Sequence, residues 1–98
     1  MFSRTIIIMI IKAVKISLKT KIKAYDKHGI TMEEIKNTLL QNKPYFSKTR
    51  DGRYVVLGRW NRFITIIFDY NEICKEAEVV TAYPSSDWQI KLYKRKRK

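Results

Sequence analysis

The sequence predicts an α+β domain in which two N-terminal helices pack on a small, mostly antiparallel sheet. Residues 53–83 contain three successive runs rich in Val, Ile, Tyr, Phe and Trp, the composition of β-strands. Residues 20–40, which precede these runs, carry two adjacent helix patterns with capping residues at their ends. A chain of 98 residues fits one domain, and neighbouring helices on one face of an antiparallel sheet make up this class.

The first part of the chain predicts extended structure. Residues 5–11, TIIIMII, form a β-branched run that fits a buried strand. From Val14 to Leu18 apolar and polar residues alternate, as they do in a strand with one solvated face. One long bent strand and two short ones both fit this pattern. Pairing within the chain and pairing with a second copy, as in a homodimer, also both remain open.

Two helices are expected next. The first runs from Thr20, a suitable N-cap, to His28, and Gly29 provides a C-terminal stop. Thr31 and Glu34 form a capping box for the second helix. Its apolar stripe consists of Ile35, Leu39 and Leu40, and it ends at Asn42–Pro44.

The strands follow in antiparallel order. Tyr45–Lys48 can pair across the Asp51-Gly52 turn with Arg53–Trp60, which forms a hairpin with Phe63–Asp69. A third run, Glu78–Tyr83, stops at Pro84. Because the apolar residues are consecutive, we expect both faces of the sheet to be at least partly covered.

The C-terminal end predicts a short helix or a basic tail. Ser85 or Ser86 can cap a helix that Trp88 and Leu92 dock on the sheet. The last residues are rich in Lys and Arg, so we divide the chain into a domain of residues 1–90 and a basic tail of residues 91–98.

The net charge predicts a polyanionic partner, RNA or another nucleic acid. The formal charge is +12, with 21 Lys and Arg against 9 Asp and Glu, so most cations have no acidic partner in an ion-pair network. With one cysteine and one histidine, Cys74 and His28, we expect neither a disulfide nor a metal site, and no cofactor. The apolar run Ile6–Ile11 is too short to span a bilayer, so a soluble, cytoplasmic protein without a membrane partner is expected.

The candidate nucleic-acid-binding residues lie on the predicted sheet and in the tail. Arg53 and Arg59 share one strand face by alternation, and Trp60 or Tyr54 is available for stacking on bases. His28, beside Gly29, is more simply a helix-end residue than a general acid or base. The predicted phosphate contacts are Arg59, Arg62, Lys94, Arg95, Lys96, Arg97 and Lys98.

Several stretches together resemble a known family. KHGITMEEIKNTLL, GRYVVLG, FITIIFDY and AEVVTAY, within residues 14–84, resemble the BrnT-like toxins and a neighbouring uncharacterised family of the RelE/ParE-like superfamily. The last of these strands reads VVTAYPSSDW and lacks the arginine-bearing ending of BrnT, which favours the uncharacterised neighbours.

The resemblance implies a metal-independent ribonuclease of a toxin–antitoxin pair, with a small antitoxin protein as partner. By position in the family pattern, the candidate catalytic residues are Arg53, Tyr83, Lys91 and Tyr93. Two other functions stay open. One is a nucleic-acid-binding module without activity, and the other is a protein-interaction domain that accepts a partner strand at a sheet edge.

Overall fold

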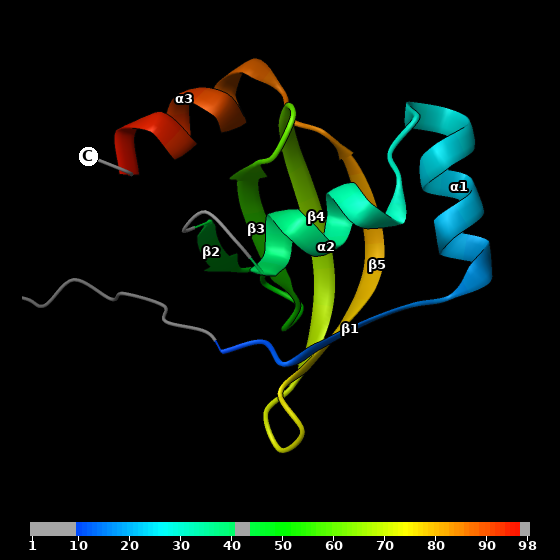
Figure 1. Cartoon of the computed structure of the whole chain (residues 1–98). Helices are drawn as coiled ribbons and strands as arrows, with labels where there is room; N and C mark the ends of the chain where they lie inside the picture. Colours follow the sequence, from blue (N-terminus) through cyan, green and yellow to red (C-terminus); the bar gives the residue numbers. More distant parts are fainter. Residues whose placement is uncertain (1–9, 41–43, 97–98) are drawn as a thin grey trace, which may run out of the picture.

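The computed structural model describes residues 10–40 and 44–96 and has the predicted α+β architecture (Figure 1). Five strands and three helices follow one another along this part of the chain. In order they are β1 (Ala13–Ile16), α1 (Leu18–His28), α2 (Met32–Leu40), β2 (Tyr45–Lys48), β3 (Tyr54–Arg59), β4 (Phe63–Asn71), β5 (Glu76–Pro84) and α3 (Asp87–Lys96).

All five strands belong to one sheet, in the order β1-β5-β4-β3-β2. The pairs β2–β3, β3–β4 and β4–β5 are antiparallel, whereas β1 runs parallel to β5. The prediction of a mostly antiparallel sheet is therefore confirmed. Because β1 pairs only with Glu76–Val79, the second half of β5 has no neighbouring strand on that side within the described chain.

Helices α2 and α3 pack on opposite faces of the sheet, as the consecutive apolar residues predicted, and Figure 1 shows α2 lying across the strands. Ile35 and Leu39 of α2 join the buried core with residues on one face of the sheet. That face contributes Val56, Ile64, Ile66, Phe68, Val79 and Ala82. On the opposite face α3 packs against the sheet through Tyr93, whose ring meets Phe63 edge to face at 5.8 Å.

The first helix begins earlier than predicted. Its N-cap is Ser17, whose hydroxyl accepts a hydrogen bond from the Thr20 N–H at 3.2 Å, so Thr20 lies in the first turn. Serine is a somewhat stronger N-cap than threonine, but the alternation of apolar and polar residues through Leu18 predicted that the strand continued past Ser17. Strand β1 consequently ends at Ile16, and Leu18 is exposed.

The other predicted ends of helices and strands agree better with the structure. Gly29 closes α1 in the left-handed conformation, with φ of 65°. The Thr31–Glu34 capping box is present: the Glu34 N–H donates to the Thr31 hydroxyl at 3.2 Å, and the Thr31 N–H donates to the Glu34 carboxylate at 3.1 Å. Strand β2 has the predicted bounds, while the predicted end of α2 at Asn42–Pro44 lies mostly outside the described residues.

The two ends of the chain differ from the predictions in detail. Trp88 does not dock α3, because it is 65% exposed and the buried residues of the helix are Gln89 and Tyr93, one position further on. The helix continues to Lys96 and so crosses the predicted boundary between residues 90 and 91. Of the run 5–11, residues 5–9 lie outside the described residues, and Ile10 and Ile11 precede β1.

Candidate nucleic-acid interface

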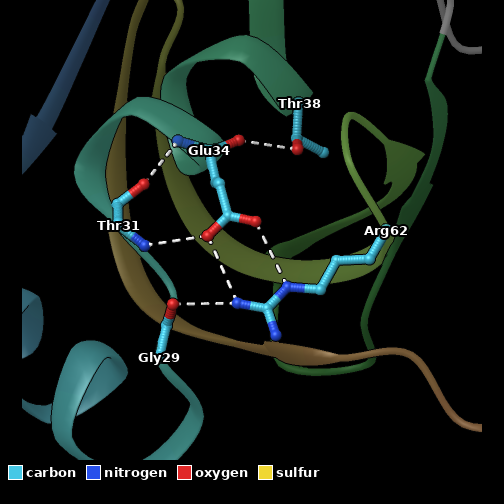
Figure 2. A network of polar contacts seen from close by, with 5 residues as sticks. All are labelled: Gly29, Thr31, Glu34, Thr38 and Arg62. Carbon is cyan, nitrogen blue, oxygen red and sulfur yellow. Dashed lines mark hydrogen bonds and ion pairs between the residues drawn. The ribbon is translucent and has the colours of Figure 1, made fainter.

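The turn between β3 and β4 is held by a network of polar contacts around Arg62 (Figure 2). Its guanidinium donates from Nε to Oε2 and from Nη2 to Oε1 of Glu34, each at 3.2 Å, and from Nη2 to the Gly29 carbonyl at 2.9 Å. The same carboxylate accepts the Thr31 N–H. Arg62, predicted to contact nucleic acid, therefore has much of its charge offset by Glu34 and positions the turn that carries Trp60.

The charge of Glu34 is stabilised in this network. Burial raises the pKa of the carboxyl, but hydrogen bonds from Arg62 and from the Thr31 backbone, with the Arg62 charge, outweigh it and leave the pKa below its ordinary value. Glu34 is thus a structural anion, and its role is to fix the β3–β4 turn against α2.

Two cations from distant parts of the chain gather over the ring of Phe63. The Arg59 guanidinium lies 5.3 Å from the ring centroid and the Lys94 ammonium 5.7 Å from it. Arg59 comes from the end of β3 and Lys94 from the second half of α3. Contacts of this kind hold a cation in place while its outer side stays available to an anion.

The outer side of α3 continues this basic region. Trp88, Lys91 and Arg95 follow the spacing i, i+3, i+7, so they share one helix face, and all three are exposed. The Ser85 N–H donates to the Phe63 carbonyl at 3.0 Å, which places the start of α3 beside the β3–β4 turn. We define the α3 surface as Arg59, Phe63, Trp88, Lys91, Lys94 and Arg95; the β3–β4 turn that carries the exposed Trp60 lies next to it in sequence.

A cluster of hydroxyl and amide groups lies beneath the start of α3. The Gln89 amide donates to the Tyr83 hydroxyl at 3.1 Å and accepts from the Thr65 hydroxyl at 3.0 Å and from the Ser86 N–H at 2.9 Å. Thr65 and Gln89 are buried, whereas Tyr83 is half-buried. The cluster therefore seats α3 on the sheet and fixes the direction of the Tyr83 hydroxyl.

The four candidate catalytic residues do not converge. Tyr83 lies in register with Leu57, two strands away, and Arg53 lies four residues before Leu57, so about 16 Å separates Arg53 from Tyr83. Arg53 instead pairs with Asp69, with Nε to Oδ1 at 3.1 Å. Tyr93 is 8% exposed and packs on Phe63, and Lys91 lies on the exposed side of α3.

The structure brings together some of the predicted phosphate contacts. Arg59, Lys94 and Arg95 belong to the α3 surface. Lys96 is the last residue of α3, and Arg97 and Lys98 lie outside the described residues.

Aromatic residues are the part of this surface that sequence reasoning judged least well. Trp60 is 38% exposed at the turn, as its proposed stacking role requires. Tyr54 lies on the α2 side of the sheet, where its ring stacks on Phe68 at 5.9 Å between centroids, so it belongs to the packed layer and not to the α3 surface. Phe63 and Trp88 were overlooked as surface residues. Trp88 is the second residue of α3 and immediately precedes the buried Gln89. The spacing of a helix therefore turns its side chain away from the buried side.

Residues 10–40 and 44–96 contain no group of three His, Cys, Asp or Glu side chains placed to hold a metal ion. None of the helices in these two segments has the length and apolar character needed to cross a membrane. Comparison of the chain with protein-family models, with curated proteins and with solved structures found no match.

Proposed function

We propose that this protein binds single-stranded RNA through the α3 surface. One observation carries the proposal: Arg59 and Lys94, from separate elements, are held over one aromatic ring on the surface that carries the exposed Trp88, and the exposed Trp60 follows Arg59 in the adjoining turn. Cations that track phosphates, next to rings on which bases stack, are the two parts of a sequence-tolerant single-strand site. RNA is the expected strand because the resemblance to RelE/ParE-like toxins implies it.

The packing of α3 supports this proposal. The polar cluster around Gln89 and the contact of Tyr93 with Phe63 fix the helix on the sheet, so its outer cations are presented in a defined arrangement. A preorganised surface loses less side-chain entropy on binding than a flexible basic tail. The net charge of +12 adds a long-range attraction for any polyanion.

The test must distinguish RNA binding at the α3 surface from the general attraction of RNA to a basic protein. We would measure binding of a labelled single-stranded RNA to R59Q/K94Q and to the control K36Q/R50Q, which removes one Lys and one Arg from exposed positions elsewhere. A reduction of about tenfold in affinity in the first variant and of less than about twofold in the second is expected. Equal reductions would attribute the interaction to net charge and overturn the proposed site.

A metal-independent ribonuclease of the toxin type is the second candidate. The observation that favours it is the half-buried Tyr83, whose hydroxyl is oriented by Gln89 on the face that α3 covers. An antitoxin-like partner protein belongs to this candidate as well. Labelled RNA incubated with the protein and a chelator, beside Y83F and R53A, tests it on a denaturing gel. Cleavage that disappears in Y83F supports the ribonuclease candidate, whereas RNA that is bound but stays intact supports only the RNA-binding function.

A further inference from the structure

A pocket of about 150 Å³ lies between α1 and the free edge of β5, away from the α3 surface. It is lined from α1 by Thr20, Lys23, Ala24, Lys27 and His28, and from β5 by Val80, Thr81 and Ala82. None of these residues belongs to the α3 surface, so the pocket is a separate feature of the molecule. Figure 1 shows α1 beside the edge of β5 rather than over the centre of the sheet.

The pocket lies where the strand pairing of β5 changes. Strand β1 stops pairing at Val79, and a register shift between Ile67 and Phe68 leaves Val80 as an extra residue in β5. The extra residue interrupts the alternation of side chains between the two faces, so the successive residues Val80, Thr81 and Ala82 can all border one pocket beside the strand's edge. A sheet edge presents unpaired backbone N–H and C=O groups, and concave edges of this kind can bind anions through their N–H groups.

The residues of α1 that face this edge are unusual for a packed helix. Positions 20, 23, 24, 27 and 28 follow the spacing of a core-facing stripe, where apolar side chains are expected. Only Ala24 of this set is buried, and Lys23, Lys27 and His28 stand beside it at the pocket. Apolar packing therefore does not explain these residues.

Pairing within the chain does not explain them either. Among residues 10–40 and 44–96 the ion pairs are Arg53–Asp69 and Arg62–Glu34, so neither Lys23 nor Lys27 has a carboxylate at pairing distance. The end of α1 is capped by its backbone, since the Gly29 N–H donates to the Tyr25 carbonyl at 2.7 Å and the Ile30 N–H to the Ala24 carbonyl at 3.3 Å.

We propose that this pocket binds a phosphate group, carried either by a small anion or by the end of a nucleic-acid strand. Lys23 and Lys27, one helical turn apart, can supply charge and hydrogen-bond donors to such a group, and His28, Thr20 and Thr81 are the other polar residues that line the pocket. A bound anion also relieves the repulsion between Lys23 and Lys27, neither of which forms an ion pair within the described chain.

The first experiment uses inorganic phosphate as the probe. Amide ¹H–¹⁵N shifts of the full chain are followed as phosphate replaces chloride at constant ionic strength, so that screening does not change. Saturable shifts at Val80, Thr81 and Ala82 are expected. Shifts that stay linear with concentration, or that appear only on α3, overturn the proposal.

A matched pair of variants tests the role of the lysines. K23Q/K27Q removes the two pocket cations, and K19Q/K21Q removes two exposed cations from the same helix that do not line the pocket. Phosphate affinity is expected to fall at least about tenfold in the first variant and less than about twofold in the second. Equal falls in both variants overturn the proposal. Far-ultraviolet circular dichroism checks that both remain folded.

A second arm identifies the source of the phosphate. Oligonucleotides of one sequence, with either a 5′-phosphate or a 5′-hydroxyl, are compared on the wild-type chain and on R59Q/K94Q. Pocket shifts that require the 5′-phosphate assign the site to a strand end, and equal shifts with inorganic phosphate alone assign it to a small anion; both support the site. If R59Q/K94Q no longer binds RNA but keeps the phosphate response, the two sites are independent.

Discussion

Arg62 and Glu34, 28 residues apart, form a forked ion pair in which two guanidinium nitrogens meet the two carboxylate oxygens at 3.2 Å. Glu34 is also the capping-box residue of α2, so one carboxylate joins the start of a helix to the turn between two central strands. The Arg62 side chain is 40% exposed and that of Glu34 only 11%. Removal of the arginine would therefore leave a mostly buried charge without its partner.

We predict that R62A destabilises the fold by about 1–3 kcal/mol, because several hydrogen bonds to a buried carboxylate disappear together. R62K should recover only part of this, since an ammonium cannot make the forked contact. Urea denaturation of the two variants checks the prediction. The control is R50A, which removes an exposed arginine from the β2–β3 turn and should cost less than about 0.5 kcal/mol. Equal stability of R62A and R50A contradicts it.

The same pair predicts how stability depends on pH. The pKa of Glu34 in the folded chain lies below its ordinary value of 4.5, so its contribution is present above the unfolded pKa and is lost as the pH falls through the folded pKa. The difference in unfolding free energy between wild type and E34Q should shrink as the pH is lowered from 7 toward 3. E33Q removes an exposed charge from the same turn and serves as control. A difference that grows in acid would reverse the sign and refute the prediction.

Local signals explain which parts of the fold could be predicted. The Thr31–Glu34 box and Gly29 act within one or two turns of chain, and both appear in the structure. The first helix begins at Ser17, three residues before the predicted cap Thr20, and serine is the stronger N-cap of the two; the alternation through Leu18 had predicted a strand there. The parallel pairing of β1 with β5 joins residues more than 60 positions apart, and no local pattern encodes it.

The candidate site was harder to predict, for the same reason. Strand alternation placed Arg53 and Arg59 on one face, but Arg53 immediately precedes β3 and Arg59 ends it, so their surroundings differ: Arg53 pairs with Asp69, and Arg59 lies over Phe63. The sequence predicted that Trp88 docks α3 on the sheet, but the buried side of the helix is displaced by one residue and Gln89 makes that contact. Sequence periodicity identifies the buried side of a helix by its apolar residues. In α3 one position on that side is the Gln89 amide, which is buried through several hydrogen bonds, so periodicity did not identify it.

The contact between Gly58 and Thr38 gives a prediction about packing. A Cβ added at Gly58 would lie 2.7 Å from Cγ2 of Thr38, whose hydroxyl is held by a 2.7 Å hydrogen bond to the Glu34 carbonyl. G58A should therefore destabilise the fold by about 1–3 kcal/mol, as overpacking of a core does. Thermal and urea unfolding of the single variant check this value.

The double variant G58A/T38S identifies the cause. Serine keeps the hydroxyl of Thr38 and removes the methyl group that the new Cβ would meet. If the close approach is responsible, G58A should cost less in the T38S background than in the wild type, by about 1 kcal/mol or more. An equal cost in both backgrounds would point to the strand backbone instead.

The salt dependence of RNA binding separates the cations of the α3 surface from Trp60 in the adjoining turn. Removing one cation that neutralises a phosphate should lower the slope of log affinity against log salt by about 0.7 for a single strand, so R59Q/K94Q should lower it by about 1.4. W60A should weaken binding by about 1–3 kcal/mol without changing the slope, because base stacking releases no counterions. Fluorescence anisotropy at several salt concentrations measures both quantities. A slope that falls in W60A as much as in R59Q/K94Q would mean that Trp60 acts by positioning the neighbouring cations rather than by stacking on a base.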